Sequence, residues 1–191
     1  MSPESALSTR RLAPGAALAQ AQPWQAPPVT LESPALDVIT DLTQMKAATV
    51  QPGVSLHEAE QTMIYQGVRM LFVVTEMPAL EGLITTTDLR GAKAMAAVHD
   101  LGLHWDELTV ADVMTGLPML DAIDFDAMRS ARVGNVIATL KQFGRNHLLV
   151  VDQGTRVRGV VSRSQIERQL GRVIEMAEVA SSFAEIEKML A

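Results

Sequence analysis

The chain has 191 residues and a mass of 20.6 kDa, enough for one ordinary domain or for two small ones packed together. It is 48% hydrophobic and 20% charged, a balance too apolar for a disordered chain, so most of it should fold. The net charge of -6 argues against a duplex nucleic-acid binder, and the absence of cysteine excludes disulfides, thiolate metal sites and cysteine nucleophiles. The apolar runs fall well short of the about 20 residues that a membrane helix needs. We therefore expect a cytoplasmic protein that contacts neither membrane nor nucleic acid.

Residues 1–34 differ in composition from the rest and carry six of the nine prolines. Proline removes backbone donors and interrupts helices, so this segment is predicted to be a flexible arm. Arg10 and Arg11 precede a short apolar stretch that faintly resembles an export signal, but Pro14 and Gly15 interrupt it. A flexible or docking tail is the favoured interpretation, and the isolated Trp24 would pack on a partner subunit or stay exposed.

The first folded elements are predicted to be a short strand at 48–50 and a helix that begins after Ser55. Ser55 and Glu58 have the spacing of a capping box, and Gly67 suits the left-handed residue that ends a helix. The helix is expected to bury one apolar stripe. That stripe consists of Leu56, Ala59, Met63 and Ile64.

A second strand is predicted at 71–74, where aliphatic and aromatic residues follow one another. Met77-Pro78-Ala79 indicates a turn, and 82–85 indicates the returning strand. A helix should then begin near Asp88 and run to about Val98. The segment is thus predicted to follow a β-α-β-β-α order.

The same order recurs 77 residues later without a gap. Gly67 aligns with Gly144, and the segment 82–89 aligns with 159–166. The second copy is predicted to have strands at 120–123, 148–151 and 159–162, a turn at 152–154 and a last helix from Ser164 that continues through Ile174. Its first helix should bury the stripe Val133, Val136, Ile137 and Leu140. Two such units are expected to pack sheet against sheet about a pseudo-twofold axis, giving an α/β fold.

A stretch with three acids, at Asp121, Asp124 and Asp126, lies between Thr115 and the long helix of the second copy. It lacks the glycine and terminal glutamate of an EF-hand, so a strand followed by an acidic helix start is favoured over a calcium loop. A further capping box at Ser182–Glu185 predicts a C-terminal helical extension.

These residues resemble the CBS domain, which occurs in tandem pairs called Bateman modules. The segment Gly82-Leu83-Ile84-Thr85-Thr86-Thr87-Asp88 resembles the family's Gly-apolar-apolar-Ser/Thr-x-x-Asp signature, and Val110–Thr115 resembles the D-V-M-T motif that precedes a unit. The resemblance covers roughly residues 40–172. It predicts an arm at 1–34, a first CBS unit at 35–108, a second at 109–172 and an extension at 173–191.

The resemblance implies ligand binding in a cleft between the units, with AMP, ADP, ATP or S-adenosylmethionine as the ligand. Asp88 resembles the residue that accepts hydrogen bonds from the ribose hydroxyls, and Thr85 and Thr87 resemble hydroxyl contacts to ribose or phosphate. The backbone at Thr49 and Val50 would read the adenine rim. In the second copy the matching positions are Ser162 and Gln165, and an amide at the aspartate position predicts a weaker or empty second site. The alternative interpretation is that Thr-x-x-Asp before a helix simply caps that helix and that Thr85 is only a strand end.

Several charged residues flank these turns and could neutralise phosphates or merely form a solvated rim. They are Arg69, Arg90, Lys93, Arg145 and Arg163. His147 begins a strand beside the predicted cleft, where it could touch a phosphate or be a satisfied surface or core histidine. No metal-ligand cluster, Walker loop or catalytic constellation is evident in the sequence, so we expect no metal and no enzymatic activity.

Two functions follow as hypotheses. The first is a regulatory module that binds an adenosine compound and signals to an unknown protein effector through conformational or oligomeric change. The second is a structural interaction module whose cleft is degenerate and whose arm and tail drive homo-oligomer assembly. A homodimer is expected in either case, because CBS modules commonly pair. A nucleotide-hydrolysing enzyme is a distant third.

Overall fold

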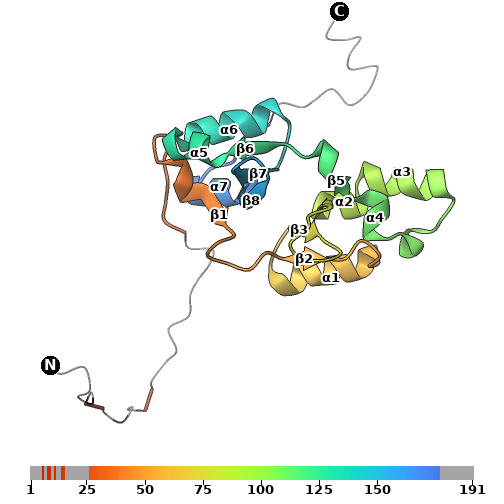
Figure 1. Cartoon of the computed structure of the whole chain (residues 1–191), viewed down its shortest axis with the longest axis horizontal. Helices are drawn as coiled ribbons and strands as arrows, with labels where there is room; N and C mark the ends of the chain where they lie inside the picture. The colour runs from red at the N-terminus through yellow and green to blue at the C-terminus, as the bar shows by residue number, and fades with distance from the viewer. Residues whose placement is uncertain (1–5, 7, 10, 12–13, 16–25, 177–191) are drawn as a thin grey trace, which may run out of the picture.

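The computed structural model describes residues 26–176 and, before them, residues 6, 8, 9, 11, 14 and 15. Two four-stranded sheets, each covered by helices, make up the folded part of the chain (Figure 1). The α/β prediction is thus confirmed. The first sheet and its helices comprise β2 (Thr49–Val50), α1 (Leu56–Gln66), β3 (Met70–Val73), β4 (Gly82–Thr85), α2 (Thr86–Arg90), α3 (Ala92–Leu101) and β5 (Thr115–Gly116).

The second sheet is built on the same plan and takes all but its first elements from the later part of the chain. Short elements connect the two, namely η2 (Trp105–Glu107), α4 (Val110–Val113) and η3 (Leu117–Met119). The second sheet and its helices comprise η1 (Ala35–Val38), β1 (Ile39–Asp41), β6 (Ala122–Asp124), α5 (Phe125–Ser130), α6 (Val133–Gln142), β7 (His147–Asp152), β8 (Arg156–Ser162) and α7 (Arg163–Leu170).

The hairpins of the two sheets have the same register, residue for residue. Met70 pairs with Thr85 and Val73 with Gly82 in the first sheet, while His147 pairs with Ser162 and Val150 with Gly159 in the second. Every number in the second pair set exceeds its counterpart by the 77 residues of the sequence repeat. The repeat seen in the sequence is therefore a repeat of structure.

The two units exchange their outermost strands. β1 precedes the first unit in the chain but pairs antiparallel with β8 of the second sheet. β5 precedes the second unit but pairs antiparallel with β4 of the first sheet. Figure 1 shows β1 among the elements of the second unit, and Ala35 and Val38 of η1 lie in that unit's core. A boundary between residues 108 and 109 thus separates the repeats along the chain but does not separate the two sheets.

Each sheet buries both of its faces. In β3 and β4, Leu71 and Ile84 pack beneath the helices of their own unit, whereas Phe72 and Leu83 belong to a cluster shared with Leu149 of the second sheet. The sheets therefore pack face to face, as the repeat predicted. Burial on both faces explains why these strands read as continuous apolar runs rather than as alternating ones.

The predicted start and end of α1 are confirmed, but its apolar stripe is narrower than predicted. Ser55 and Glu58 form the capping box, and Gly67 ends the helix with a φ of 66°. Leu56, Ala59 and Met63 are buried, whereas Ile64 is 67% exposed. Ile64 lies one position beyond Met63, about 100° further around the helix, which turns it toward solvent.

Two other helix predictions are wrong in their bounds. The helix expected from Asp88 to Val98 is two helices, because Gly91 takes an extended backbone between α2 and α3. The last helix ends at Leu170 rather than continuing through Ile174, because Gly171 adopts a left-handed conformation with a φ of 67°. The strand and acidic helix start predicted around Asp124 are present as β6 and α5.

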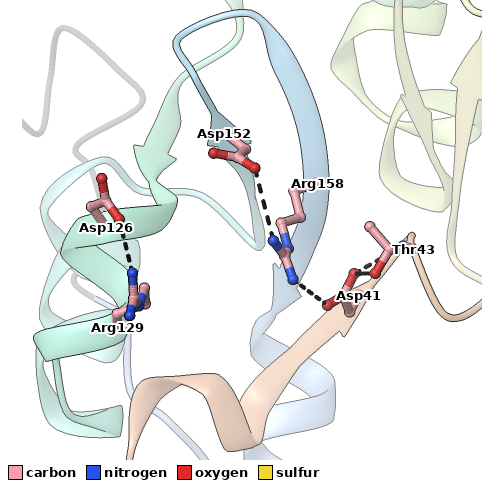
Figure 2. A network of polar contacts seen from close by, with 6 residues as sticks. All are labelled: Asp41, Thr43, Asp126, Arg129, Asp152 and Arg158. Atoms are coloured by element: carbon pink, nitrogen blue, oxygen red, sulfur yellow. Dashed lines mark hydrogen bonds and ion pairs between the residues drawn. The ribbon is translucent and has the colours of Figure 1, made fainter.

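A polar network fastens β1 to the second sheet (Figure 2). Arg158 of β8 contacts Asp41 at 3.4 Å and Asp152 at 3.8 Å, and its guanidinium carbon lies 3.9 Å from the ring centre of Phe125. Asp41 also accepts hydrogen bonds from the backbone and hydroxyl of Thr43 at 2.8 and 2.7 Å. These hydrogen bonds, more than the ion pair with Arg158, lower the pKa of Asp41.

The predictions for Trp24 and for the helix after Ser182 lie outside the described residues, as does most of the arm at 1–34. Over the described part of the chain, none of the helices combines the length and apolar content that crossing a bilayer requires. The same part of the chain holds no group of three or more His, Cys, Asp or Glu arranged to bind a metal ion.

Candidate functional site

A pocket of about 310 Å³ lies between the two units. Its walls come from the start of α2, the segment that links β5 to β6, and the turn that precedes β7. Leu83, Met119, Leu120, Leu148 and Leu149 supply apolar surface, and charged and hydroxyl residues supply the remainder. Its volume lies at the lower end of the range of about 300–1,000 Å³ that small-molecule sites occupy.

Asp88 is held at one wall of the pocket by a reciprocal cap with Thr85. One carboxylate oxygen of Asp88 accepts hydrogen bonds from the Thr85 backbone N–H at 2.8 Å and from its hydroxyl at 2.7 Å. In return, the Asp88 N–H donates to the Thr85 hydroxyl at 3.4 Å. The helix-cap role of this motif is therefore present, and it fixes the direction of the Asp88 carboxylate.

The second oxygen of Asp88 forms an ion pair with Lys93 of α3. The distance from Lys93 Nζ to Asp88 Oδ1 is 2.9 Å, and Nζ also donates a hydrogen bond to the hydroxyl of Thr115 in β5. The Asp88 side chain is only 12% exposed, whereas that of Lys93 is 48% exposed. A single lysine thus connects α2, α3 and the exchanged strand β5 at the edge of the pocket.

Three arginines add positive charge to the same pocket. Arg145 lies 3.6 Å from Asp121, and Arg163 lies 3.7 Å from Glu167, distances typical of loose ion pairs. Arg69 has no ion-pair partner among the described residues. Together with Lys93 they outnumber the two acids that line the pocket, Asp88 and Asp121, so the pocket favours an anion.

His147 faces the pocket from the first residue of β7. Burial, opposed by Asp88 and supported by nearby Arg69 and Arg163, lowers the pKa of His147 to about 4. The imidazole is therefore neutral at pH 7. A neutral ring has one N–H donor and one acceptor, so it can contribute a hydrogen bond to a ligand without adding charge.

The structure brings together Thr85, Thr87 and Asp88 of the predicted site residues, and Arg69, Lys93, Arg145, Arg163 and His147 line the same pocket. Thr49 and Val50 do not line it, because β2 lies at the opposite edge of the first sheet from β5. Arg90 points elsewhere and pairs with Glu60 at 2.8 Å.

The second-copy residues Ser162 and Gln165 lie outside this pocket as well. Gln165 accepts a hydrogen bond from the Thr40 hydroxyl at 3.0 Å, and the hydroxyls of Ser162 and Ser164 lie 3.0 Å apart. The amide at the aspartate position is thus engaged with the exchanged strand β1. The two halves of the repeat consequently differ in how they use the same position.

Sequence reasoning missed Thr115, Met119 and Leu120 as pocket residues. They belong to the segment that connects the two units. The only sequence signal for Thr115 as a pocket residue was the D-V-M-T motif that ends there. Thr115 lies opposite Leu83 because β5 is exchanged into the first sheet.

Comparison with known proteins agrees with this architecture. Residues 37–94 match the family model for the CBS domain. The chain is 25% identical over 133 residues, 70% of its length, to a homoserine O-acetyltransferase of Methanosalsum zhilinae, and it spans only 24% of that protein's length.

Three solved structures share the fold. The crystal structure of an uncharacterised conserved protein from Pyrococcus horikoshii has a TM-score of 0.56 and 22% identity, over 78% of this chain and 100% of that chain. CBSX2 of Arabidopsis thaliana in complex with AMP has a TM-score of 0.52 and 20% identity, over 71% and 94%. The CBS domain of a bacterial CNNM/CorC family Mg²⁺ transporter in complex with ATP has a TM-score of 0.50 and 14% identity, over 75% and 91%. The family model matches residues 37–94, and the second unit repeats the same hairpin in register, so the chain contains a segment that matches the CBS domain and has the fold of a CBS pair.

Proposed function

We propose that this chain is a regulatory module that binds an adenine nucleotide in the pocket between its two units. The observation that carries the proposal is the meeting of Asp88, an apolar wall and an excess of cationic side chains in one pocket. A nucleotide presents a diol, a flat base and an anionic phosphate, and these groups match the three kinds of surface. The complexes of CBSX2 with AMP and of the CNNM/CorC CBS domain with ATP support the same ligand class.

In the proposed complex the ribose hydroxyls donate to the Asp88 carboxylate, which the Thr85 cap already orients. The base packs against apolar side chains of the linking segment, Met119 and Leu120. The phosphates extend toward Arg69, Arg145 and Arg163, whose guanidinium groups suit phosphate geometry. Because these residues come from both units, a bound nucleotide would favour one relative placement of the units, which is how the signal would reach an effector protein.

The experiment is a ligand panel read by melting temperature and calorimetry. Adenosine, AMP, ADP, ATP and S-adenosylmethionine are titrated into the full chain, and a ligand at 100 times its dissociation constant should stabilise the fold by about 2.7 kcal/mol. No shift with any of the five would refute nucleotide binding. A shift with S-adenosylmethionine alone would refute the nucleotide class in favour of the sulfonium ligand.

The chain offers a matched pair of variants that separates ligand contact from helix capping. Thr109 and Asp112 form the same cap as Thr85 and Asp88, with hydrogen bonds of 2.7 and 2.8 Å, at an exposed position outside the pocket. Asp88→Asn and Asp112→Asn should cost similar stability, about 1 kcal/mol each. Only Asp88→Asn should abolish the nucleotide-dependent shift; equal shifts in both variants would leave Asp88 as a cap alone.

Assembly into a homodimer is the second candidate function, and exposed apolar residues on α1 favour it. Tyr65 is 92% exposed and Ile64 is 67% exposed, at adjacent positions near the end of the helix. Light scattering of the wild type and of Tyr65→Lys would test this surface. A wild-type monomer at all accessible concentrations would exclude a homodimer.

A further inference from the structure

The Asp88 carboxylate has little free hydrogen-bonding capacity in the structure. Oδ2 accepts two hydrogen bonds from Thr85, and Oδ1 accepts the ammonium of Lys93 at 2.9 Å. A carboxylate offers about four acceptor positions in total, so these three leave room for about one more. A ribose diol needs two acceptor positions. The two hydrogen bonds from Thr85 form the cap at the start of α2 and are not available for exchange. Lys93 is therefore the partner that a ribose would have to replace.

Lys93 can leave Asp88 at small cost. Its side chain is 48% exposed, and ion pairs of that exposure contribute little because solvent screens them. Its four-carbon stem also allows the ammonium to reach other positions from the same backbone site. The hydrogen bond to the Thr115 hydroxyl is the only other contact of Nζ recorded among the described residues.

The direction in which Lys93 would move is set by the remaining charges of the pocket. Arg69, Arg145 and Arg163 line the region where an anionic group would be held, and Lys93 lines the same pocket. Once a diol occupies Asp88, the ammonium loses its counter-charge, and the nearest new one would be the phosphate of the same ligand. An uncharged nucleoside brings no such replacement.

We propose that Lys93 exchanges partners when ligand binds, leaving Asp88 for the phosphate, and that it thereby makes the pocket select phosphorylated nucleosides over unphosphorylated ones. The inference rests on the proposed function and adds to it a specificity-determining residue. Lys93 neutralises Asp88 in the structure, so a nucleoside must break the Asp88–Lys93 pair without compensation. A nucleotide gives Lys93 a second anion and recovers that loss.

The test is Lys93→Met, which keeps the length of the side chain and removes its charge, with binding of adenosine and of ATP measured by calorimetry. Adenosine should bind up to about fivefold more tightly, because the competing ion pair is gone. ATP should bind about tenfold or more weakly, because a charge-assisted contact to phosphate is lost. Arg90→Met is the control, since Arg90 pairs with Glu60 outside the pocket and should leave both affinities unchanged.

The outcomes separate the inference from the function on which it rests. If the wild type binds neither adenosine nor any nucleotide, the proposed function fails and the role of Lys93 fails with it. If the wild type binds but Lys93→Met weakens both ligands, or changes neither, nucleotide binding stands and partner exchange is refuted. Thr115→Val gives a second readout, because it frees Lys93 from its other contact. ATP should then bind more tightly. Adenosine should not, because the Asp88–Lys93 pair still competes with it.

Discussion

Acid should destabilise this protein through His147, and the size of the effect can be worked out from the pocket. The ordinary histidine pKa is 6.5, and burial lowers that of His147 to about 4 in the folded chain. Between these values the unfolded chain binds a proton that the folded chain does not, so the free energy of unfolding falls as pH drops below 6.5. A pKa difference of one unit corresponds to about 1.4 kcal/mol of unfolding free energy. The difference between 6.5 and about 4 therefore gives an upper limit of about 3 kcal/mol once pH reaches 4.

Charged groups that face His147 also shift its pKa, each in the direction that its charge dictates. Asp88 favours the protonated ring, whereas Arg69 and Arg163 oppose it, and the burial effect exceeds all three. Urea unfolding of the wild type and of His147→Asn at pH 7.5, 6.5, 5.5 and 4.5 would isolate the contribution, because asparagine does not titrate. Between pH 6.5 and 5.5 the free energy of unfolding of the wild type should fall by about 1 kcal/mol more than that of the variant. Parallel curves would refute the reasoning, whatever the absolute stability of the variant.

Three further changes test the fold. Gly82→Ala should destabilise the chain by about 2 kcal/mol in urea unfolding, because a Cβ there would lie 2.5 Å from the backbone oxygen of Thr115. Gly53→Ala is the control and should be near neutral, because nothing lies within 4 Å of a Cβ at that position. Equal effects of the two substitutions would contradict the steric reasoning. Arg158→Met should cost about 2 kcal/mol by removing the contacts to Asp41 and Phe125, and an unchanged melting temperature would show that this network does not stabilise the fold. Arg129→Met is its control in the same view (Figure 2): that exposed pair, at 3.6 Å from Asp126, should contribute less than about 0.5 kcal/mol.

Local signals in the sequence predicted the elements that local chemistry determines. The capping box at Ser55, the left-handed glycine at 67 and the stripe from Val133 to Leu140 all depend on residues within one or two turns of a helix. The repeat went further and predicted the same order of strands and helices in both units, because two copies of one pattern constrain each other. Those features are present in the structure as predicted.

The sequence could not reveal which sheet each short strand would join. β1 has three residues and β5 has two, too few for any periodicity, and their partners are chosen by tertiary packing. The same limitation hid Thr115 from the predicted pocket. The break at Gly91 was missed for a related reason, since glycine inside a helical pattern is tolerated as often as it interrupts.

The glycines of the repeat acquire a physical explanation from the exchanged strands. Gly82 and Gly159 occupy equivalent positions, and at each a Cβ would collide with the incoming strand, at the Thr115 oxygen in one case and at Ile39 and the Thr40 oxygen in the other. The signature glycine is required because another backbone approaches it closely. Its presence in both copies indicates that both were shaped to receive a neighbour's strand.

Strand exchange also bears on how such a chain could have arisen. A lone copy of the unit would leave the edge beside its glycine strand open and its own first strand without a partner, and exposed edges of this kind promote association. A single-unit ancestor would have resolved both problems by trading strands with a twin molecule. Fusion of two such genes would then have made permanent an intertwined pair that already existed, and left later mutation free to specialise one half for recognition and the other for support.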